Sequence, residues 1–269
     1  MQTTLGSDFS FAGIGVFSGE NVAFTVRPSE PGSGMVFRRN DHDIPASIDL
    51  VEEVPNRTKL VCDGESVQVV EHLLAALRGM GVDNALIMTD SMELPILDAS
   101  SKDYVDAIRR VGVIEQDSPK DELIIQKPIY IEEDSLFVGI FPDNESRITY
   151  HLDHEHPQIG KQTDSLLLNV ENFTEFIGPA RTFVTEDEAK ILINNKVVGI
   201  DDTYVAIMVS DDGFNKPLRH PKEMVHHKML DMIGDLSLAY WPIRGHIIGI
   251  RSGHFANRKL ARKIAELIS

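Results

Sequence analysis

Residues Met224–Tyr240 read MVHHKMLDMIGDLSLAY, and this stretch decides how the rest of the chain is understood. Its apolar residues recur at helical spacing, which predicts a helix. On that helix His227, Asp231 and Asp235 form a column along one face. An imidazole and a carboxylate one turn apart are typical zinc ligands, and a further carboxylate can orient a neighbouring group. His226 points about 100° away and is the weaker candidate. The alternative is a polar face that is only hydrated, because this spacing is short and common.

The composition is that of a globular protein. The 269 residues, 42% hydrophobic and 25% charged, suffice for one large or two ordinary domains. No apolar run approaches the roughly 18 residues of a membrane helix, and the N-terminus lacks a signal-peptide pattern. The single cysteine, Cys62, fits a reducing compartment, so we expect a cytoplasmic protein without an integral membrane segment. A formal net charge of −16 argues against nucleic acid as a partner, because its phosphates would be repelled.

The periodicity predicts the same order of elements twice, strands followed by helix, strand and helix. The expected helices of the first half are Val69–Arg78 and Lys102–Val111, and those of the second half are Glu186–Ile193, Met224–Tyr240 and Asn257–Leu267. The aperiodic stretch IEQDSPKDE is interpreted as a linker. We therefore predict an N-terminal α+β domain over residues 1–113, a linker over 114–122 and a C-terminal α+β domain over 123–269.

The helix Val69–Arg78 carries Glu71 and His72 among apolar residues. Burying this pair is costly unless both groups have partners. One interpretation is a histidine satisfied by a backbone carbonyl. The other is that His72 joins His227 and Asp231 as a third zinc ligand, which leaves one position for water, as in catalytic zinc sites. Glu71 would then act as a general base on that water.

Two turns carry further candidate residues. In Arg251–His254, which precedes the last helix, His254 suits a general acid or an oxyanion partner whose other ring nitrogen is held by Asp235. The alternative is a helix-capping turn with an exposed histidine. In Arg181–Phe183, Thr182 suits a hydrogen-bond donor to a developing oxyanion, or the N-cap-like entry to the following helix.

The motifs VEHLLAAL, ARTF, HHKMLDMIGDL and RSGHFAN together resemble the UDP-3-O-acyl-N-acetylglucosamine deacetylase family, zinc amidases that commit a pathway to lipid A. GIGVFSG, FRRND, ELPILD and HLDHEHP also follow the family order, so the resemblance spans nearly the whole chain. It implies two domains of similar topology, each a sheet packed against helices, with the active site at their interface. It also implies a hydrolase that removes the N-acetyl group of its UDP-sugar substrate with Zn²⁺, or alternatively Fe²⁺, as the cofactor.

The resemblance assigns roles by position. The expected catalytic set is His72, His227 and Asp231 as metal ligands, Glu71 as the base, His254 as the acid, Asp235 as the residue that orients His254, and Thr182 as an oxyanion donor. The expected substrate contacts are Lys228, Phe183, Asp153, His154 and Arg251. Asp153 and His154 match the uridine-binding positions of the family, and Lys228 and Arg251 are candidates for positive charge near a diphosphate.

The chain also departs from the family pattern. His154 replaces a Phe-type stacking partner, and Phe17 stands where the family usually has a histidine. The Gly-Gly-Ser-rich turn beside the acyl channel is replaced by Val198–Tyr204, which contains Asp201 and Asp202. Burying a carboxylate against methylene groups is costly, so we expect activity to depend only weakly on the length of the acyl chain.

Two alternatives therefore stay open. One is a deacetylase of a short-chain or unacylated UDP-N-acetyl sugar, and the other is a UDP-sugar-binding homologue without catalysis. The presence of both Glu71 and His254 favours an enzyme. The expected partner is a UDP-linked N-acetylglucosamine substrate, and we expect a monomer.

Overall fold

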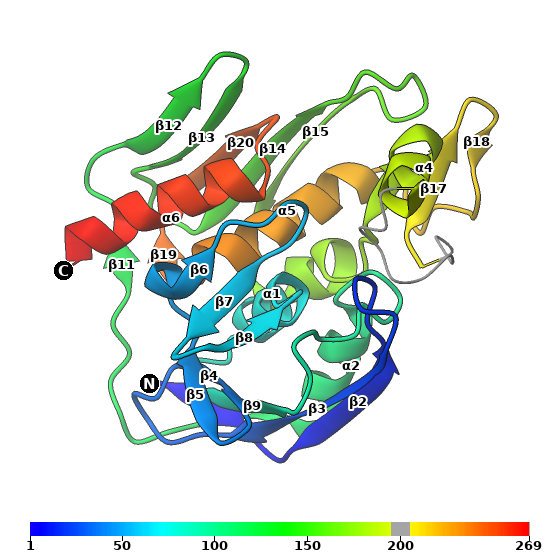
Figure 1. Cartoon of the computed structure of the whole chain (residues 1–269). Coiled ribbons are helices and arrows are strands. Elements are labelled where there is room, and N and C mark those ends of the chain that lie inside the picture. Colours follow the sequence, from blue (N-terminus) through cyan, green and yellow to red (C-terminus); the bar gives the residue numbers. More distant parts are fainter. Residues whose placement is uncertain (195–204, 269) are drawn as a thin grey trace.

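The computed structural model describes residues 1–194 and 205–268, so the expectation for Val198–Tyr204 concerns residues outside the described part. Two five-stranded sheets form the outer layers of the described structure (Figure 1). The first consists, in spatial order, of β2 (Phe9–Ile14), β3 (Asn21–Pro28), β9 (Ala85–Thr89), β4 (Met35–Arg39) and β5 (His42–Pro45). The second consists of β12 (Ile129–Glu133), β13 (Leu136–Phe141), β20 (His246–Ile250), β14 (Arg147–Asp153) and β15 (Lys161–Leu167).

The two sheets share one topology. In each, the third and fourth strands in spatial order are parallel, and the other neighbouring strands are antiparallel. Apolar side chains alternate along the strands, as in Val22, Phe24 and Val26 of β3, and these alternate residues are buried. The identical order and sense of the strands confirm the predicted α+β fold with two similar halves.

Helices fill the space between the sheets (Figure 1). They are α1 (Glu71–Gly79) and α2 (Lys102–Val111) of the first half, and α5 (Glu223–Leu236) and α6 (His254–Ile268) of the second. At the centre α1 packs directly on α5, and a Cβ placed on Gly234 would lie only 2.4 Å from the carbonyl oxygen of Glu71. Glycine at this crossing lets the backbones approach, and the approach brings Glu71 and His72 close to α5.

Each half contains an insertion at the same point, between the fifth strand of its sheet and its first central helix. The first comprises η1 (Ile48–Leu50), β6 (Val51–Glu52), β7 (Lys59–Cys62) and β8 (Glu65–Gln68). The second comprises α3 (Val170–Asn172), η2 (Phe173–Ile177), β16 (Phe183–Thr185), α4 (Glu186–Asn194), β17 (Ile207–Ser210) and β18 (Gly213–Phe214). Two short sheets complete the fold, β1 (Thr3–Leu5) with β10 (Val113–Glu115) and β11 (Leu123–Ile124) with β19 (Ile243–Arg244).

Several boundaries differ from the prediction. Helix α1 begins at Glu71 rather than at Val69, because Val69 has φ of 62° and lies outside the helical region. Helix α5 ends at Leu236, four residues before the predicted end, and α6 begins at His254 rather than at Asn257. Strand β10 pairs with β1 at the start of the predicted linker, and the domain limits stay a prediction.

Among residues 1–194 and 205–268, no helix combines the length and the apolar character that crossing a membrane requires.

Candidate active site

His72 of α1 and the pair His227 and Asp231 of α5 converge where the two halves meet. All three side chains are buried, and one ligand atom from each lies within 4.8 Å of the others. The Nε2 atoms of His227 and His72 lie 3.4 and 3.8 Å from Oδ1 of Asp231. The burial excludes the alternative in which this face of α5 is only hydrated.

The electrostatics of the three residues fit a divalent metal ion. Burial lowers the pKa of His72 to about 3 and also lowers that of His227, so both imidazoles are neutral near pH 7. Burial alone would raise the pKa of Asp231, but His227 and Lys228 hold it well below its usual range. Neutral imidazoles and an ionised carboxylate are the donor forms that a metal requires.

Neighbouring groups orient the side chains of His227 and Asp231. The Nδ1 of His227 bonds the carbonyl oxygen of Ala180 at 3.1 Å, which leaves Nε2 toward the site. The ammonium group of Lys228 donates to Oδ2 of Asp231 at 2.7 Å, which leaves Oδ1 toward the histidines. The Nδ1 of His72 is buried without a hydrogen-bond partner in the described part of the chain.

Glu71 is the first residue of α1 and lines the same cavity as His72. Its Oε2 accepts a hydrogen bond from the backbone N–H of Thr58 at 3.1 Å. Burial raises the pKa of Glu71 to about 7. A carboxylate with a pKa near the working pH is suited to take a proton from water and release it again.

His254 lies across the same cavity and is held by Asp235. Its Nδ1 lies 2.9 Å from Oδ2 of Asp235, and that oxygen also accepts from the side-chain amide of Asn257 at 3.0 Å. Burial alone would lower the pKa of His254, but the carboxylates of Asp235 and Asp231 raise it to about 9. His254 is therefore protonated at neutral pH and can donate a proton. It is the first residue of α6 and only 15% of its side chain is exposed, so the alternative of an exposed capping histidine is wrong.

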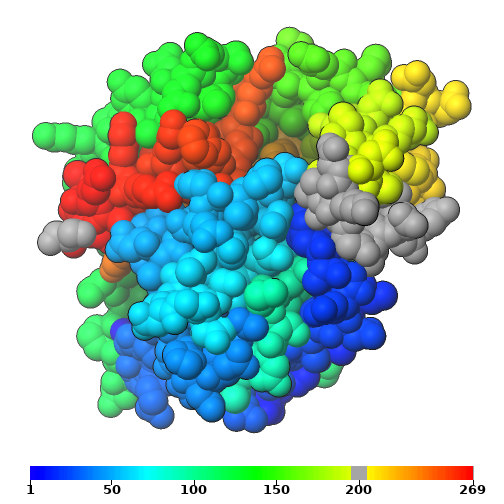
Figure 2. Space-filling view, viewed as in Figure 1, coloured from blue at the N-terminus to red at the C-terminus, as the bar shows by residue number. Residues whose placement is uncertain are grey.

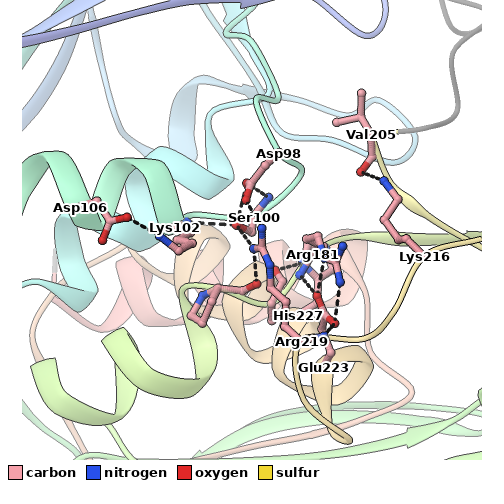
Figure 3. A network of polar contacts seen from close by, with 12 residues as sticks. Asp98, Ser100, Lys102, Asp106, Arg181, Val205, Lys216, Arg219, Glu223 and His227 are labelled. Carbon is pink, nitrogen blue, oxygen red and sulfur yellow. Dashed lines mark hydrogen bonds and ion pairs between the residues drawn. The ribbon is translucent and has the colours of Figure 1, made fainter.

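Thr182 follows Arg181, which belongs to a polar network that holds this segment in place (Figure 3). Arg181 donates to Glu223 through Nε at 2.7 Å and Nη2 at 3.1 Å. The guanidinium of Arg219 donates to the carbonyl oxygen of Pro179 at 2.7 Å and to Oδ2 of Asp98 at 2.5 Å. Since Asp98 belongs to the first half, this network ties the Thr182 segment to both halves of the molecule.

The alternative role of Thr182 as a helix N-cap is wrong. The residue before α4 is Thr185, whose hydroxyl accepts from the N–H of Glu188 at 3.2 Å. In return, the carboxylate of Glu188 accepts from the N–H of Thr185 at 2.9 Å, which completes a capping box. Thr182 instead lines the cavity that contains Glu71 and His254.

The cavity lined by Glu71, His72, Thr182 and His254, the central cavity, has a volume of about 270 Å³ and is lined by residues of both halves. Figure 2 shows the N-terminal half, chiefly blue and cyan, against the C-terminal half. Its polar side is formed by the residues described above. Its apolar side comes from both halves and includes Val16, Phe17, Ile96, Val184, Leu192 and Val205. The cavity therefore presents polar groups and an apolar wall to a single ligand.

A second cavity of about 360 Å³ adjoins the first and shares five lining residues with it, Asn56, Thr182, Phe183, His227 and Lys228. All five residues predicted to contact the substrate line it, namely Asp153, His154, Phe183, Lys228 and Arg251. The rings of His154 and Phe183 lie edge to face, 6.3 Å apart. A hydrogen bond from Lys161, 3.1 Å away, lowers the pKa of Asp153.

Thr58 and Asn257 both bond the carboxylate of Asp235, and neither was predicted from the sequence. Asn257 lies one turn after His254 on α6, so the helical spacing contains a signal for it. Thr58 bonds Asp235 across 177 residues of sequence, and no local pattern indicates that contact.

The chain matches known proteins over almost its whole length. Residues 2–266 match the family model described as UDP-3-O-acyl N-acetylglycosamine deacetylase (LpxC). Proteins named UDP-3-O-acyl-N-acetylglucosamine deacetylase are similar in Thermosynechococcus vestitus (37% identity; 98% of this chain and 94% of the relative), Chlamydia abortus (35%; 99% and 98%) and Myxococcus xanthus (38%; 98% and 86%).

Proposed function

Because the chain belongs to the UDP-3-O-acyl N-acetylglycosamine deacetylase family, we propose that it hydrolyses the N-acetyl group of UDP-3-O-acyl-N-acetylglucosamine in lipid A biosynthesis. The reaction breaks an amide bond, releases acetate and leaves a free amine on the sugar. The observation that carries the proposal is the position of the His72, His227 and Asp231 group between a buried carboxylate, Glu71, and a buried imidazole, His254.

The side chains supply the proton transfers that amide hydrolysis needs. A divalent metal held by His72, His227 and Asp231, which we assign as Zn²⁺ with Fe²⁺ as the alternative, would polarise the amide carbonyl and lower the pKa of water. Glu71 takes the proton of the attacking water, and His254 donates a proton to the leaving amine.

Thr182 completes the catalytic set. Its hydroxyl donates to the oxyanion of the tetrahedral intermediate together with the imidazolium of His254. Because Asp235 binds Nδ1 of His254, the proton that His254 transfers is the one on Nε2.

The adjoining cavity is assigned to the UDP moiety. Lys228 and Arg251 place positive charge beside a diphosphate, which an acidic protein must supply locally. His154 and Phe183 offer aromatic faces to uridine, and Asp153 offers a hydrogen-bond acceptor. The apolar wall of the central cavity is left for the 3-O-acyl group.

The proposal is tested by incubating the metal-loaded protein with UDP-3-O-acyl-N-acetylglucosamine and with unacylated UDP-N-acetylglucosamine. We expect equal amounts of acetate and free amine from the acylated substrate. Glu71→Gln is the matched control, because it keeps the size of the side chain and should lower kcat by about 10²–10⁴-fold. Binding of the substrate without acetate release would favour a non-catalytic UDP-sugar-binding protein, and equal turnover of both substrates would favour an unacylated substrate.

A further inference from the structure

Thr58 lies immediately before β7 in the first insertion and is completely buried. Its backbone N–H donates to Oε2 of Glu71 at 3.1 Å, and its hydroxyl donates to Oδ1 of Asp235 at 2.8 Å. Glu71 belongs to α1 of the first half, and Asp235 belongs to α5 of the second. One residue therefore bonds the group that acts as base and the group that holds the acid, His254.

The hydrogen bonds around Asp235 fix the direction of each proton. Its Oδ2 accepts from His254 and Asn257, so the hydroxyl of Thr58 is the donor that satisfies Oδ1. Arg258 donates to the same hydroxyl through Nη1 at 3.5 Å, which leaves the hydroxyl proton for Asp235. Without this hydroxyl, Oδ1 of a fully buried carboxylate would lose a charge-assisted bond, and the carboxylate would be free to turn away from His254.

We propose that Thr58 is a positioning residue that sets the placement of His254, through Asp235, relative to Glu71. It does not act on the substrate itself, since it does not line the cavity in which the substrate is placed. The inference rests on the proposed function for the roles of Glu71 and His254. Catalytic geometry is sensitive to displacements of about 1 Å, so a loosened His254 should lower the rate rather than substrate binding.

The first test compares Thr58→Val with Thr58→Ser. Valine keeps the shape and the backbone N–H but removes the hydroxyl, so we expect kcat to fall about 10- to 100-fold with KM and metal content unchanged. Serine keeps the hydroxyl and should restore most of the activity. Thr89→Val is the matched control, because Thr89 is also buried and its hydroxyl bonds a backbone carbonyl, that of Ala23, outside the site.

The second test repeats Thr58→Val in a His254→Ala background. If Thr58 acts through His254, the valine substitution should change the residual rate by less than about threefold there. The same full loss in both backgrounds, or no rescue by serine, would overturn the inference. Should Thr58→Val fail to fold, Thr58→Ala removes the hydroxyl with a smaller side chain and is judged by the same outcomes. Failure of the proposed function is recognised separately, because the wild-type protein would then release no acetate.

Discussion

His226 and His227 are neighbours in sequence and are equally buried, yet they have different partners. The Nε2 of His226 lies 2.6 Å from Oδ2 of Asp164, whereas His227 faces Asp231. The difference follows from the rotation of about 100° between successive helical residues. A histidine on this helix is therefore a candidate metal ligand only if its side chain also points toward Asp231.

This pair gives the first prediction. His227→Ala should lose the metal, because it removes one of three donors, whereas His226→Ala should keep about one metal ion per chain. Metal analysis of the two purified variants measures the difference, and His226→Ala also serves as the control for loss of a buried histidine. Stoichiometric metal in His227→Ala would mean that the site is not the one assigned.

The second prediction concerns pH. Glu71 must be ionised to act as base, and His254 must be protonated to act as acid. We therefore expect kcat/KM to decrease at pH values below the pKa of Glu71 and at pH values above the pKa of His254. Burial raises the pKa of Glu71 to about 7, and the carboxylates of Asp235 and Asp231 raise the pKa of His254 to about 9. A divalent cation in the site would lower both pKa values because it disfavours added protons. Asp235→Asn removes charge that raises the pKa of His254, so the basic limb should move to lower pH. An unchanged basic limb in that variant would show that the basic limb does not report the pKa of His254.

At the scale of elements, the crossing of α1 and α5 brings His72 close to His227 and Asp231. Gly234 allows this crossing, because an added Cβ would meet the carbonyl oxygen of Glu71 at 2.4 Å. The two helices cannot keep their separation with any larger residue at this position. We therefore expect a substitution of this glycine to affect both stability and catalysis.

Gly234→Ala should accordingly destabilise the protein by about 1–3 kcal/mol and lower kcat by about 10- to 100-fold, since α1 and Glu71 must shift together. Gly253→Ala is the control for stability, because an added methyl group there meets no atom within 4 Å. Thermal unfolding and acetate release measure the two effects. Wild-type values for both in Gly234→Ala would show that the helices can adjust without cost.

The helix Lys102–Val111 could be predicted to the residue, because its periodicity is strong. The strand His42–Pro45 was not predicted, because it has four residues with Ile44 as its buried apolar residue and forms by pairing with β4. The pairing of His254 with Asp235 followed from the motifs. The contact of Thr58 with Asp235 did not, because it depends on how the two halves dock.

At the scale of the whole molecule, the duplicated architecture explains where the site lies. The central helices α1 and α5 occupy equivalent places in the two halves and pack on each other, so His72 of α1 meets His227 and Asp231 of α5 at one interface. The two insertions also occupy equivalent places, and both line the central cavity through residues such as Asn56 and Val184. The equivalent helices of the two halves therefore form the centre of the site, and the two insertions form part of the cavity wall.

The acyl-chain preference is a prediction at this scale. The described part of the cavity has an apolar wall, whereas Asp201 and Asp202 belong to a segment outside the described residues. A continuous apolar channel would add about 0.8 kcal/mol per buried methylene, so kcat/KM would rise steeply with chain length. Because burying the carboxylates of Asp201 and Asp202 against methylene groups is costly, we expect kcat/KM to level off at short chain lengths instead. The measurement uses substrates with no, a short and a long acyl group. A rise of several orders of magnitude from short to long would contradict this expectation.

The zinc dependence of acetate release tests the central claim most directly. The apolar core includes residues of both halves, and Lys228 forms an ion pair with Asp231, so chelation should leave the circular dichroism spectrum unchanged. We predict that the chelated protein releases no acetate from UDP-3-O-acyl-N-acetylglucosamine, and that added zinc restores activity up to about one ion per chain. Full activity after complete removal of metal, or loss of secondary structure on chelation, would contradict a catalytic metal site at His72, His227 and Asp231.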